Sequence, residues 1–385
     1  MPTQREPLVI AATRVAETAG RLATTMESSR RLDPDVFKAF VDAGLLRHFV
    51  PVDAGGRDGT FTDLLPAVAA IGERCTASAW CASLFASSPR FVEFLPPAGQ
   101  REVWAQGPDV AVVCSVVPCG TAVREAAGLR VSGRWPYLSG VEFADWLIVC
   151  AQVAGTEPPE LRLVAVPAAQ CQVEDTWFSV GMRATGSNTA VLHDVLVPPH
   201  REFAWSEVFA GRPARESAPR PDPGLAPLPA VNGLTFVVPA LGAARGALAE
   251  LTRYLENKIQ NAPRLPGMPG VQGNLATYEG ALTRSAAEID AAQLVLERAA
   301  AAADLRGGLG RAAAVRNARD GAFAIDLLVT ATNRIYRTAG TAGQAAGGAL
   351  ERMWRDVNSV ATHQALQPEP AARNYLRAVF ESGAG

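Results

Sequence analysis

A β-rich stretch in the middle of an otherwise helical chain is the feature that most constrains the fold. Residues 109–209 consist of short runs such as VAVVCSVV and DWLIVCAQVA, separated by Gly, Pro and Asp turns. The residues on either side, 1–108 and 231–385, carry apolar residues at helical spacing. Helices and strands that are segregated along a chain in this way predict an α+β protein.

The same pattern divides the chain into segments. Residues 1–108 predict an N-terminal helical domain, 109–210 an antiparallel β-barrel or sandwich, 211–230 a Pro- and Ala-rich linker, and 231–385 a four-helix bundle. The four bundle helices are expected at 234–257, 275–303, 312–339 and 347–364. A β domain between two helical domains leaves a cleft at their junction, which is a favoured place for a ligand.

Charge and cysteine usage exclude several classes of function. The net charge of -2 gives no basic surface for nucleic acid or for an anionic membrane. No apolar run reaches the roughly 18 residues of a membrane span, and the N-terminus lacks the pattern of a signal peptide. The six cysteines have no CxxC spacing and no nearby His, so they predict no metal site. We therefore expect a cytoplasmic protein with reduced cysteines.

Residues 133–146, GRWPYLSGVEFADW, read as a strand, a tight corner at Ser139-Gly140 and a second strand. An aromatic wall beside a hydroxyl suits a flat heteroaromatic ring, because Trp135 can stack on the ring and Ser139 can hydrogen-bond to its edge. Taken alone, the same residues are more often a core aromatic and a turn serine. The interpretation therefore depends on the motifs that surround this corner.

Four motifs in the correct order make the whole chain resemble the acyl-CoA dehydrogenase superfamily. Residues 45–80 contain a VP loop, a GG pair and a helix ending in Ser-Ala-Trp, and residues 133–146 resemble the corner that cradles the flavin ring. Residues 175–201 carry the Thr-Gly-Ser of that family, and residues 348–366 resemble its Arg-x-x-Arg-Asp helix. The resemblance implies a helical domain, a middle β-barrel and a C-terminal four-helix bundle.

Dehydrogenation of an acyl thioester needs a carboxylate base, and the sequence lacks one at both positions where relatives place it. The residue that matches the usual Glu after Arg355 is Gln364, preceded by His363, and residues 224–249 contain no Asp or Glu. What remains resembles the flavin-dependent monooxygenase branch. Its GxWxxxSG signature is present at residues 133–140, and its His after the Arg-Asp helix is present as His363.

This branch implies a two-component enzyme. It takes reduced flavin, FMNH2 or FADH2, from a separate reductase, binds O2, and oxygenates a small molecule through a C4a-hydroperoxyflavin. The implied reaction is hydroxylation of an aromatic or polycyclic secondary metabolite, or oxidation of an amino-sugar at its nitrogen. Relatives are mostly tetramers, so the resemblance also implies a homo-oligomer.

The resemblance assigns roles to individual residues. The catalytic candidates are His363 and Ser139. The flavin contacts are Trp135, Ser139, Ser115, Thr185 and Ser187. The substrate contacts are Trp80, Ser88 and Gln364. Ser88 stands where phenol hydroxylases of the branch often carry a second His, and this departure argues against a simple phenol.

Two alternatives stay open. The first is an FAD-dependent dehydrogenase of the acyl-CoA dehydrogenase type with an unrecognised base, which would be yellow and would be bleached by an acyl thioester. The second is a non-catalytic protein with the flavin-binding fold, such as a partner subunit, which would bind flavin in neither redox state. A fold alone does not distinguish these alternatives, because function resides in sites.

Overall fold

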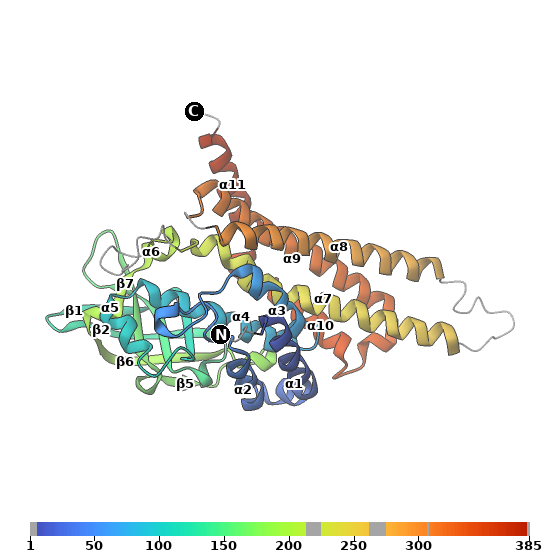
Figure 1. The fold of residues 1–385 in the computed structure, drawn as a ribbon, viewed down its shortest axis with the longest axis horizontal. Helices are drawn as coiled ribbons and strands as arrows, with labels where there is room; N and C mark the ends of the chain where they lie inside the picture. Colours follow the sequence, from blue (N-terminus) through green and yellow to red (C-terminus); the bar gives the residue numbers. More distant parts are fainter. Residues whose placement is uncertain (1–5, 213–224, 262–274, 306–307, 383–385) are drawn as a thin grey trace, which may run out of the picture.

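The computed structural model describes residues 6–212, 225–261, 275–305 and 308–382 (Figure 1). A group of N-terminal helices lies beside a β-sheet, and long C-terminal helices extend away from both (Figure 1). This arrangement confirms the α+β fold. Most of the predicted linker and the Pro/Gly-rich segment 262–273 lie outside the described residues, and the predicted domain limits stay predictions.

The N-terminal helices follow the capping signals of the sequence. They are α1 (Leu8–Ser29), α2 (Pro34–Ala43), α3 (Phe61–Gly72), α4 (Thr76–Ser87) and α5 (Pro97–Val103). At the start of α2 the Asp33 side chain accepts a hydrogen bond from the Asp35 N–H, and Gly44 ends the helix with φ at 74°. The predicted cap at Asp33 and the predicted end near Gly44 are therefore confirmed.

The middle of the chain forms one seven-stranded sheet. The strands are β1 (Val112–Glu125), β2 (Gly128–Leu138), β3 (Trp146–Val153), β4 (Glu160–Pro167), β5 (Gln172–Glu174), β6 (Asn188–Val197) and β7 (Glu202–Ala204). Their order is β5-β6-β2-β1-β3-β4-β7, so the sheet is open rather than a closed barrel. In addition, β1 and β3 are parallel, which corrects the expectation of a wholly antiparallel domain.

The parallel pair arises from the connection between β2 and β3. The chain leaves β2 through Gly140, forms a short 3-10 helix (Val141–Phe143) and enters β3 on the other side of β1. A strand run followed by a short turn looks the same in sequence whether the chain folds back on its neighbour or crosses the end of another strand. The turn residues predicted the corner correctly but carried no information about which strand lies beside β3.

The C-terminal part consists of long helices arranged around α7. The helices are α7 (Leu228–Asn261), α8 (Leu275–Ala303), α9 (Arg311–Ala339), α10 (Ala349–Val360) and α11 (Pro368–Ser382), preceded by the short α6 (Trp205–Ala210). The four predicted bundle helices are present, and α11 is an additional helix that projects from the bundle (Figure 1). A Cβ on Gly233 of α7 would lie 2.8 Å from the Gly321 Cα of α9, so glycine allows the two backbones to touch.

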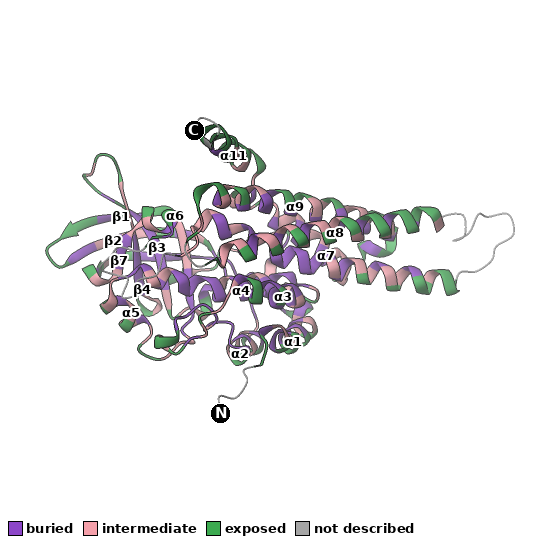
Figure 2. Ribbon diagram, turned by 45° about the horizontal axis from the view of Figure 1, so that its top comes forward, coloured by how far each residue is buried: buried purple, intermediate pink, exposed green. Residues whose placement is uncertain are grey.

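Helix α7 is also the core element that joins the parts of the molecule. It packs against α3 and α4 as well as α8, α9 and α10, and buried residues line its inner face (Figure 2). Contrary to the expectation from the sequence, it is long and apolar enough to cross a membrane, but 72% of its most apolar window is buried inside the protein. Such burial is typical of a core helix in a soluble protein.

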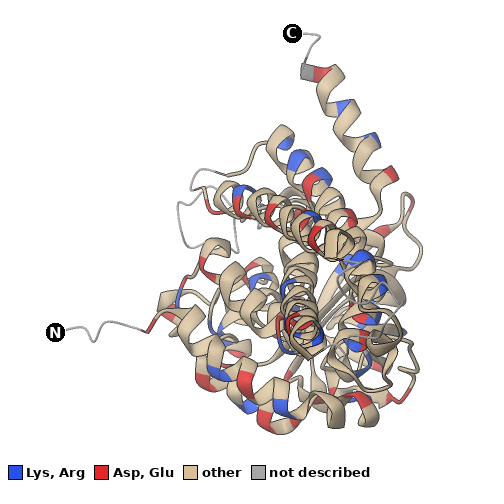
Figure 3. Cartoon of the chain, turned by 90° about the vertical axis from the view of Figure 1, so that its right-hand side faces the viewer, with Lys and Arg blue, Asp and Glu red and all other residues tan. Residues whose placement is uncertain are grey.

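Charged side chains of both signs are interspersed over the helices in the view of Figure 3. Between bundle helices they form ion pairs, for example Arg334–Glu288 at 2.7 Å and Arg298–Asp320 at 2.6 Å. Partly exposed pairs of this kind contribute little stability, typically about 1 kcal/mol or less. The apolar core around α7 therefore dominates the stability of the bundle.

Candidate active site

The register of the sheet brings two serines together. In the antiparallel pair of β2 and β6, Leu138 lies opposite Asn188, so Ser139 and Ser187 are neighbours just beyond the paired residues. Their Oγ atoms are 2.8 Å apart. Thr185 extends this contact, because its Oγ1 lies 2.6 Å from the Ser187 Oγ. All three side chains are buried.

Trp80 of α4 connects these hydroxyls to both helical parts. Its indole Nε1–H donates to the Ser139 Oγ at 2.9 Å. Its ring packs against Phe236 of α7, with centroids 5.1 Å apart, and against His363 after α10, with centroids 5.8 Å apart. The Phe236 and His363 rings are themselves 4.1 Å apart. The junction of the three segments therefore holds one continuous group of aromatic and hydroxyl side chains.

We call this group the Trp80 cluster; its members are Trp80, Ser139, Thr185, Ser187, Phe236 and His363.

His363 is held in one protonation state by its surroundings. Its Nδ1 accepts a hydrogen bond from the Ala365 N–H at 3.2 Å, so in the neutral ring the hydrogen resides on Nε2. Burial lowers the pKa of His363 to about 4, and the ring is therefore neutral at physiological pH. His363 thus presents an Nε2–H donor rather than a positive charge.

Helix α10 holds the loop that precedes Thr185 through the Arg-Asp pair of the sequence motif. Arg355 forms an ion pair with Glu27 at 2.8 Å and donates to the Val180 carbonyl oxygen. Asp356 is 1% exposed and accepts from the Met182 N–H at 2.6 Å, and burial raises the pKa of its carboxyl to about 7. The pair therefore anchors the loop that precedes Thr185.

The structure thus brings together five of the sequence-derived candidates in the Trp80 cluster: Trp80, Ser139, Thr185, Ser187 and His363.

Trp135 lies elsewhere, in the core of the β domain. It is 0% exposed, and its Nε1–H donates to the Cys150 carbonyl oxygen at 2.8 Å. A Cβ on Gly120 would come within 2.2 Å of its ring, and Gly133 is similarly close. The glycine and tryptophan of the GxWxxxSG motif therefore fit each other inside the sheet. The expectation that Trp135 contacts flavin receives no support from this placement.

Three further candidates are not joined to the cluster through their side chains in the described part of the chain. Ser115 is half-buried on β1, where the pairing with β3 becomes irregular. Ser88 is 3% exposed at the end of α4, and Gln364 is exposed at the start of the short 3-10 helix after α10. Within the described residues, no hydrogen bond or ring contact joins these three side chains to the Trp80 cluster. Their roles stay predictions.

Sequence reasoning missed the aromatic residues that surround the corner. Tyr137 lies at a bulge between the paired residues Trp135 and Leu138, with φ at 66°, and is 75% exposed. Its ring meets Trp177 edge-to-face at 6.1 Å. A non-glycine residue with positive φ is strained, and such strain is often found at functional sites. Phe236 had no sequence signal, since it is one apolar residue within an apolar helix.

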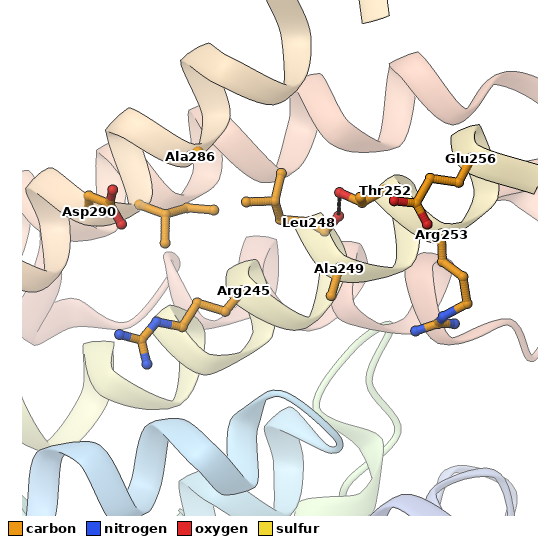
Figure 4. A pocket seen from close by; sticks show the side chains of 9 residues that line it. Arg245, Leu248, Ala249, Thr252, Arg253, Glu256, Ala286 and Asp290 are labelled. Carbon is orange, nitrogen blue, oxygen red and sulfur yellow. Dashed lines mark hydrogen bonds between the residues drawn. The ribbon is translucent and has the colours of Figure 1, made fainter. Parts of the chain in front are cut away.

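A groove between α7 and α8 is distinct from this site. Figure 4 shows that Arg245, Thr252 and Glu256 of α7 and Ala286 and Asp290 of α8 line it. It contains none of the candidate residues and no aromatic side chain. The groove follows from the packing of two helix surfaces, and we do not assign the active site to it.

The residues at the junction fit a flavin. An isoalloxazine ring is flat and apolar, with hydrogen-bonding atoms along one edge. Tyr137 presents an exposed aromatic face two residues from Ser139. Ser139 lies at the end of a hydroxyl chain, and its Oγ can form one more hydrogen bond besides those to Trp80 and Ser187. Ser139 and Tyr137 would hold the ring, and the cluster behind them would fix the position of Ser139.

Comparisons with known proteins find flavin-dependent oxygenases among the relatives of this chain. The family model "Acyl-CoA dehydrogenase, C-terminal domain" matches residues 234–368. The chain is 28% identical to the "FADH(2)-dependent resorcinol hydroxylase, oxygenase component" of Rhizobium sp. (strain MTP-10005), covering 94% of this chain and 92% of that protein.

Solved structures share the fold over nearly the whole chain. The crystal structure of 3-HSA hydroxylase from Rhodococcus sp. RHA1 has a TM-score of 0.89 at 24% identity, covering 98% of both chains. XiaF from Streptomyces sp., solved in complex with FADH2 and glycerol, has a TM-score of 0.82 at 26% identity, covering 97% of both chains. Taken with the family model and the resorcinol hydroxylase, these matches support placing the chain with the flavin-dependent monooxygenases that share the acyl-CoA dehydrogenase fold.

Proposed function

We propose that this enzyme hydroxylates a small aromatic molecule with reduced flavin and O2, and that a separate reductase supplies the flavin. The observation that carries the proposal is the Trp80 cluster, in which a chain of hydroxyls and a neutral imidazole donor meet beside aromatic rings. Reduced flavin, when bound, activates O2 and supplies the oxygen atom for transfer. Either FMNH2 or FADH2 fits the chemistry of these residues.

Each side chain of the cluster has a separate role. Ser139 hydrogen-bonds to the edge of the flavin ring, and Trp80 fixes its orientation through the Nε1–H contact. The rings of Trp80 and Phe236 form an apolar wall that holds an aromatic substrate and keeps water away. His363 donates from Nε2 to a substrate oxygen or nitrogen and so orients the ring to be attacked.

The lining favours an aromatic substrate over an amino-sugar. The ammonium and hydroxyl groups of an amino-sugar require carboxylates and several polar partners. Within the described residues, the hydrogen bonds of Trp80, Ser139 and His363 involve no carboxylate. Two aromatic rings instead pack directly on His363. We therefore place aromatic hydroxylation first, and N-oxidation of an amino-sugar is an outcome that the experiment below can detect.

A dehydrogenase of this fold would need a base aimed at the substrate. Helix α10 before His363 carries two carboxylates: Asp356 faces the Met182 N–H in the core, and Glu351 is paired with Arg355. The low pKa of His363, about 4, makes its imidazole a weak base. The geometry therefore favours oxygenation over proton abstraction from a thioester.

The test is a coupled assay with ¹⁸O2. An unrelated NADH-dependent flavin reductase supplies FMNH2 or FADH2 to the purified protein, together with a panel of phenols, naphthols, indoles and amino-sugars. We expect one ¹⁸O atom in the product of an aromatic substrate, with consumption of reduced flavin. The proposal is wrong if no compound is oxygenated and rapid mixing with O2 gives no C4a-adduct. Tight binding of oxidised FAD that an acyl thioester bleaches would support the dehydrogenase alternative, and binding of neither flavin would support the non-catalytic one.

We also propose that the enzyme is a homo-oligomer, a tetramer by the family resemblance. Leu376, Val379 and Phe380 are 51%, 46% and 67% exposed on the projecting helix α11 (Figure 1). Large apolar side chains gathered on one helix of a soluble protein are typical of a surface that another chain covers. The cytoplasmic location stays a prediction.

A further inference from the structure

The face of α4 that carries Trp80 continues past the end of that helix. Trp80, Ser83, Ser87 and Arg90 follow one another at intervals of three or four residues, through α4 and into the 3-10 helix Ser88–Phe94. Residues at this spacing lie on one side of a helix, one above the other. Ser87 and Arg90 therefore extend the wall that begins at Trp80.

Two hydrogen bonds fix this face against α7 and the segment that enters it. The Ser83 Oγ donates to the Thr235 carbonyl oxygen at 2.7 Å, and the Arg90 Nη2 donates to the Ala226 carbonyl oxygen at 3.0 Å. Residue numbers rise along α4 while they fall along α7, so the two elements run in opposite directions here. Ser87 lies between the two contacts and therefore faces the first turns of α7.

Two polar side chains at this level have no partner from the protein. The Ser87 side chain is 7% exposed, and its Oγ forms no hydrogen bond. Asn232 is half-buried, lies on the same side of α7 as Phe236, and forms no side-chain hydrogen bond within the described residues. A buried hydroxyl without a partner is uncommon in proteins. A polar group on a bound molecule would give both side chains a partner.

Arg90 adds a buried positive charge beside them. It is 9% exposed, and burial lowers its pKa to about 10, which leaves the guanidinium charged at neutral pH. Its Cζ lies 4.9 Å from the Phe61 ring centroid, but it forms no ion pair with a described residue. The nearby Asp304 carboxylate instead accepts from the Phe61 and Thr62 N–H groups. A buried charge without a counter-ion favours an anion in its vicinity.

The remaining surroundings have the same sign. Residues 76–92 and 225–249 contain no Asp or Glu. The N-terminal end of the 34-residue helix α7 also points into this region, and the helix dipole places a partial positive charge at that end. The region between α4 and the start of α7 therefore favours a negative group.

We propose that Ser87, Asn232 and Arg90 form a subsite for a carboxylate on the aromatic substrate. The inference rests on the proposed function, which places the attacked ring against Trp80 and Phe236. Ser87 lies about 10 Å beyond Trp80 along the helix axis, so a second ring or a short chain separates the carboxylate from the attacked ring. The Ser87 hydroxyl and the Asn232 amide donate to the carboxylate oxygens, and Arg90 attracts them as a fixed charge.

The test compares three probes in the oxygenation assay: a hydroxynaphthoate, its neutral carboxamide and the parent naphthol. In the wild type we expect kcat/KM for the acid to exceed that for the amide by roughly tenfold. Ser87→Ala and Asn232→Leu should each raise the KM of the acid by roughly tenfold, with little change in kcat or in the KM of naphthol. Arg90→Met should remove the preference for the acid over the amide.

A matched control separates recognition from general loss of structure. Thr332→Val removes another buried hydroxyl that has no partner, on α9, and should leave all three KM values unchanged. Ser87→Ala and Asn232→Leu decide the matter if Arg90→Met does not fold. The inference is overturned if the wild type does not prefer the acid, or if these two variants raise the KM of acid and naphthol equally. If the wild type oxygenates no aromatic compound, the proposed function fails, and the subsite fails with it.

Discussion

The position of the ring hydrogen on His363 decides whether this residue acts as a hydrogen-bond donor or as a base. Because Ala365 occupies Nδ1 and burial lowers the pKa to about 4, the imidazole should act as a neutral Nε2–H donor. We expect His363→Ala to lower kcat roughly 100-fold, and His363→Gln, which keeps an amide N–H at a similar reach, to retain more activity. The pH–rate profile should show no inflection from this residue between about pH 5.5 and 8. A His363-dependent inflection near pH 6.5 would contradict this account.

Asp356 should give the folding stability an unusual pH dependence. Its pKa is raised from the usual 3.8 to about 7, so the folded protein retains a proton that the unfolded chain has lost. The resulting stabilisation is complete below the ordinary pKa and is lost as the pH rises through the folded pKa, at about 1.4 kcal/mol per pH unit.

The Asp356→Asn variant tests this, because an amide keeps an acceptor for Met182 and does not ionise. Denaturant unfolding between about pH 4 and 8 should show Asn gaining stability relative to the wild type as the pH rises, with a plateau above the folded pKa. Asp42→Asn, at an exposed ion pair with Lys38, is the matched control and should show little slope. Parallel pH curves for Asp356→Asn and the wild type would rule the explanation out.

At the same scale, the sequence motifs predicted three hydroxyls that meet but not the position of Trp135. Ser139, Thr185 and Ser187 were expected near one another, and the register of β2 and β6 brings them together. Trp135 was expected at the flavin as well, because it shares a motif with Ser139, yet alternation along β2 directs it into the core, where it packs against two glycines. A motif shows that residues occur together, but it does not show which of them face a ligand and which of them pack.

Among the elements, the contact between α10 and the loop at 178–182 should hold the hydroxyl side of the site in position. An ideal Cβ on Gly181 would lie 2.3 Å from the Ser359 Oγ and 2.7 Å from the Arg355 carbonyl oxygen. Gly181→Ala should therefore push the loop away from α10, lower the free energy of unfolding by about 1–3 kcal/mol and weaken binding of reduced flavin.

The matched control is Gly280→Ala on the exposed side of α8, where an added Cβ meets nothing within 4 Å. That change should stabilise the helix by roughly 0.5–1 kcal/mol and leave flavin binding unaffected. Denaturant unfolding and anaerobic flavin titration measure both effects. The account of the loop is wrong if Gly181→Ala binds reduced flavin as tightly as the Gly280→Ala control.

The helices and strands themselves were largely predictable from the sequence, whereas the pairing of one strand with another was not. The cap at Asp33 and the corner at Gly140 follow from local chemistry, which acts over a few residues. The position of β3 beside β1 and the open edges of the sheet depend on contacts between distant residues. The bulge that exposes Tyr137 has the same origin, because it follows from how β2 pairs with β6.

For the whole molecule, the exposed apolar residues of α11 predict association between chains. Light scattering coupled to size exclusion should give a mass of four chains for the wild type. Replacing Leu376 and Phe380 together by Ser should lower that mass, while the same change at Ile10, an exposed apolar residue of α1, should not. A wild-type mass of one chain would refute the proposed tetramer, and an unchanged mass in the double variant would remove α11 from its interface.

At this scale the resemblance in sequence predicted the order of helices, sheet and bundle, and the comparisons confirm it. The sequence predicted a cleft where the helical and β segments meet. In the structure Trp80 contacts both Ser139 and His363 at this junction. The protonation state of His363 and the meeting of the buried hydroxyls depend on burial and on contacts between segments far apart in sequence. No local pattern encodes them.

The most direct test of the central claim is to load the protein anaerobically with FMNH2 or FADH2 and mix it rapidly with O2. We predict that reduced flavin binds, that a long-lived absorbance distinct from oxidised flavin appears, and that Ser139→Ala shortens its lifetime. Immediate formation of oxidised flavin and H2O2 at the rate seen without protein, for both flavins, would contradict the assignment of this chain's junction as an oxygenase site.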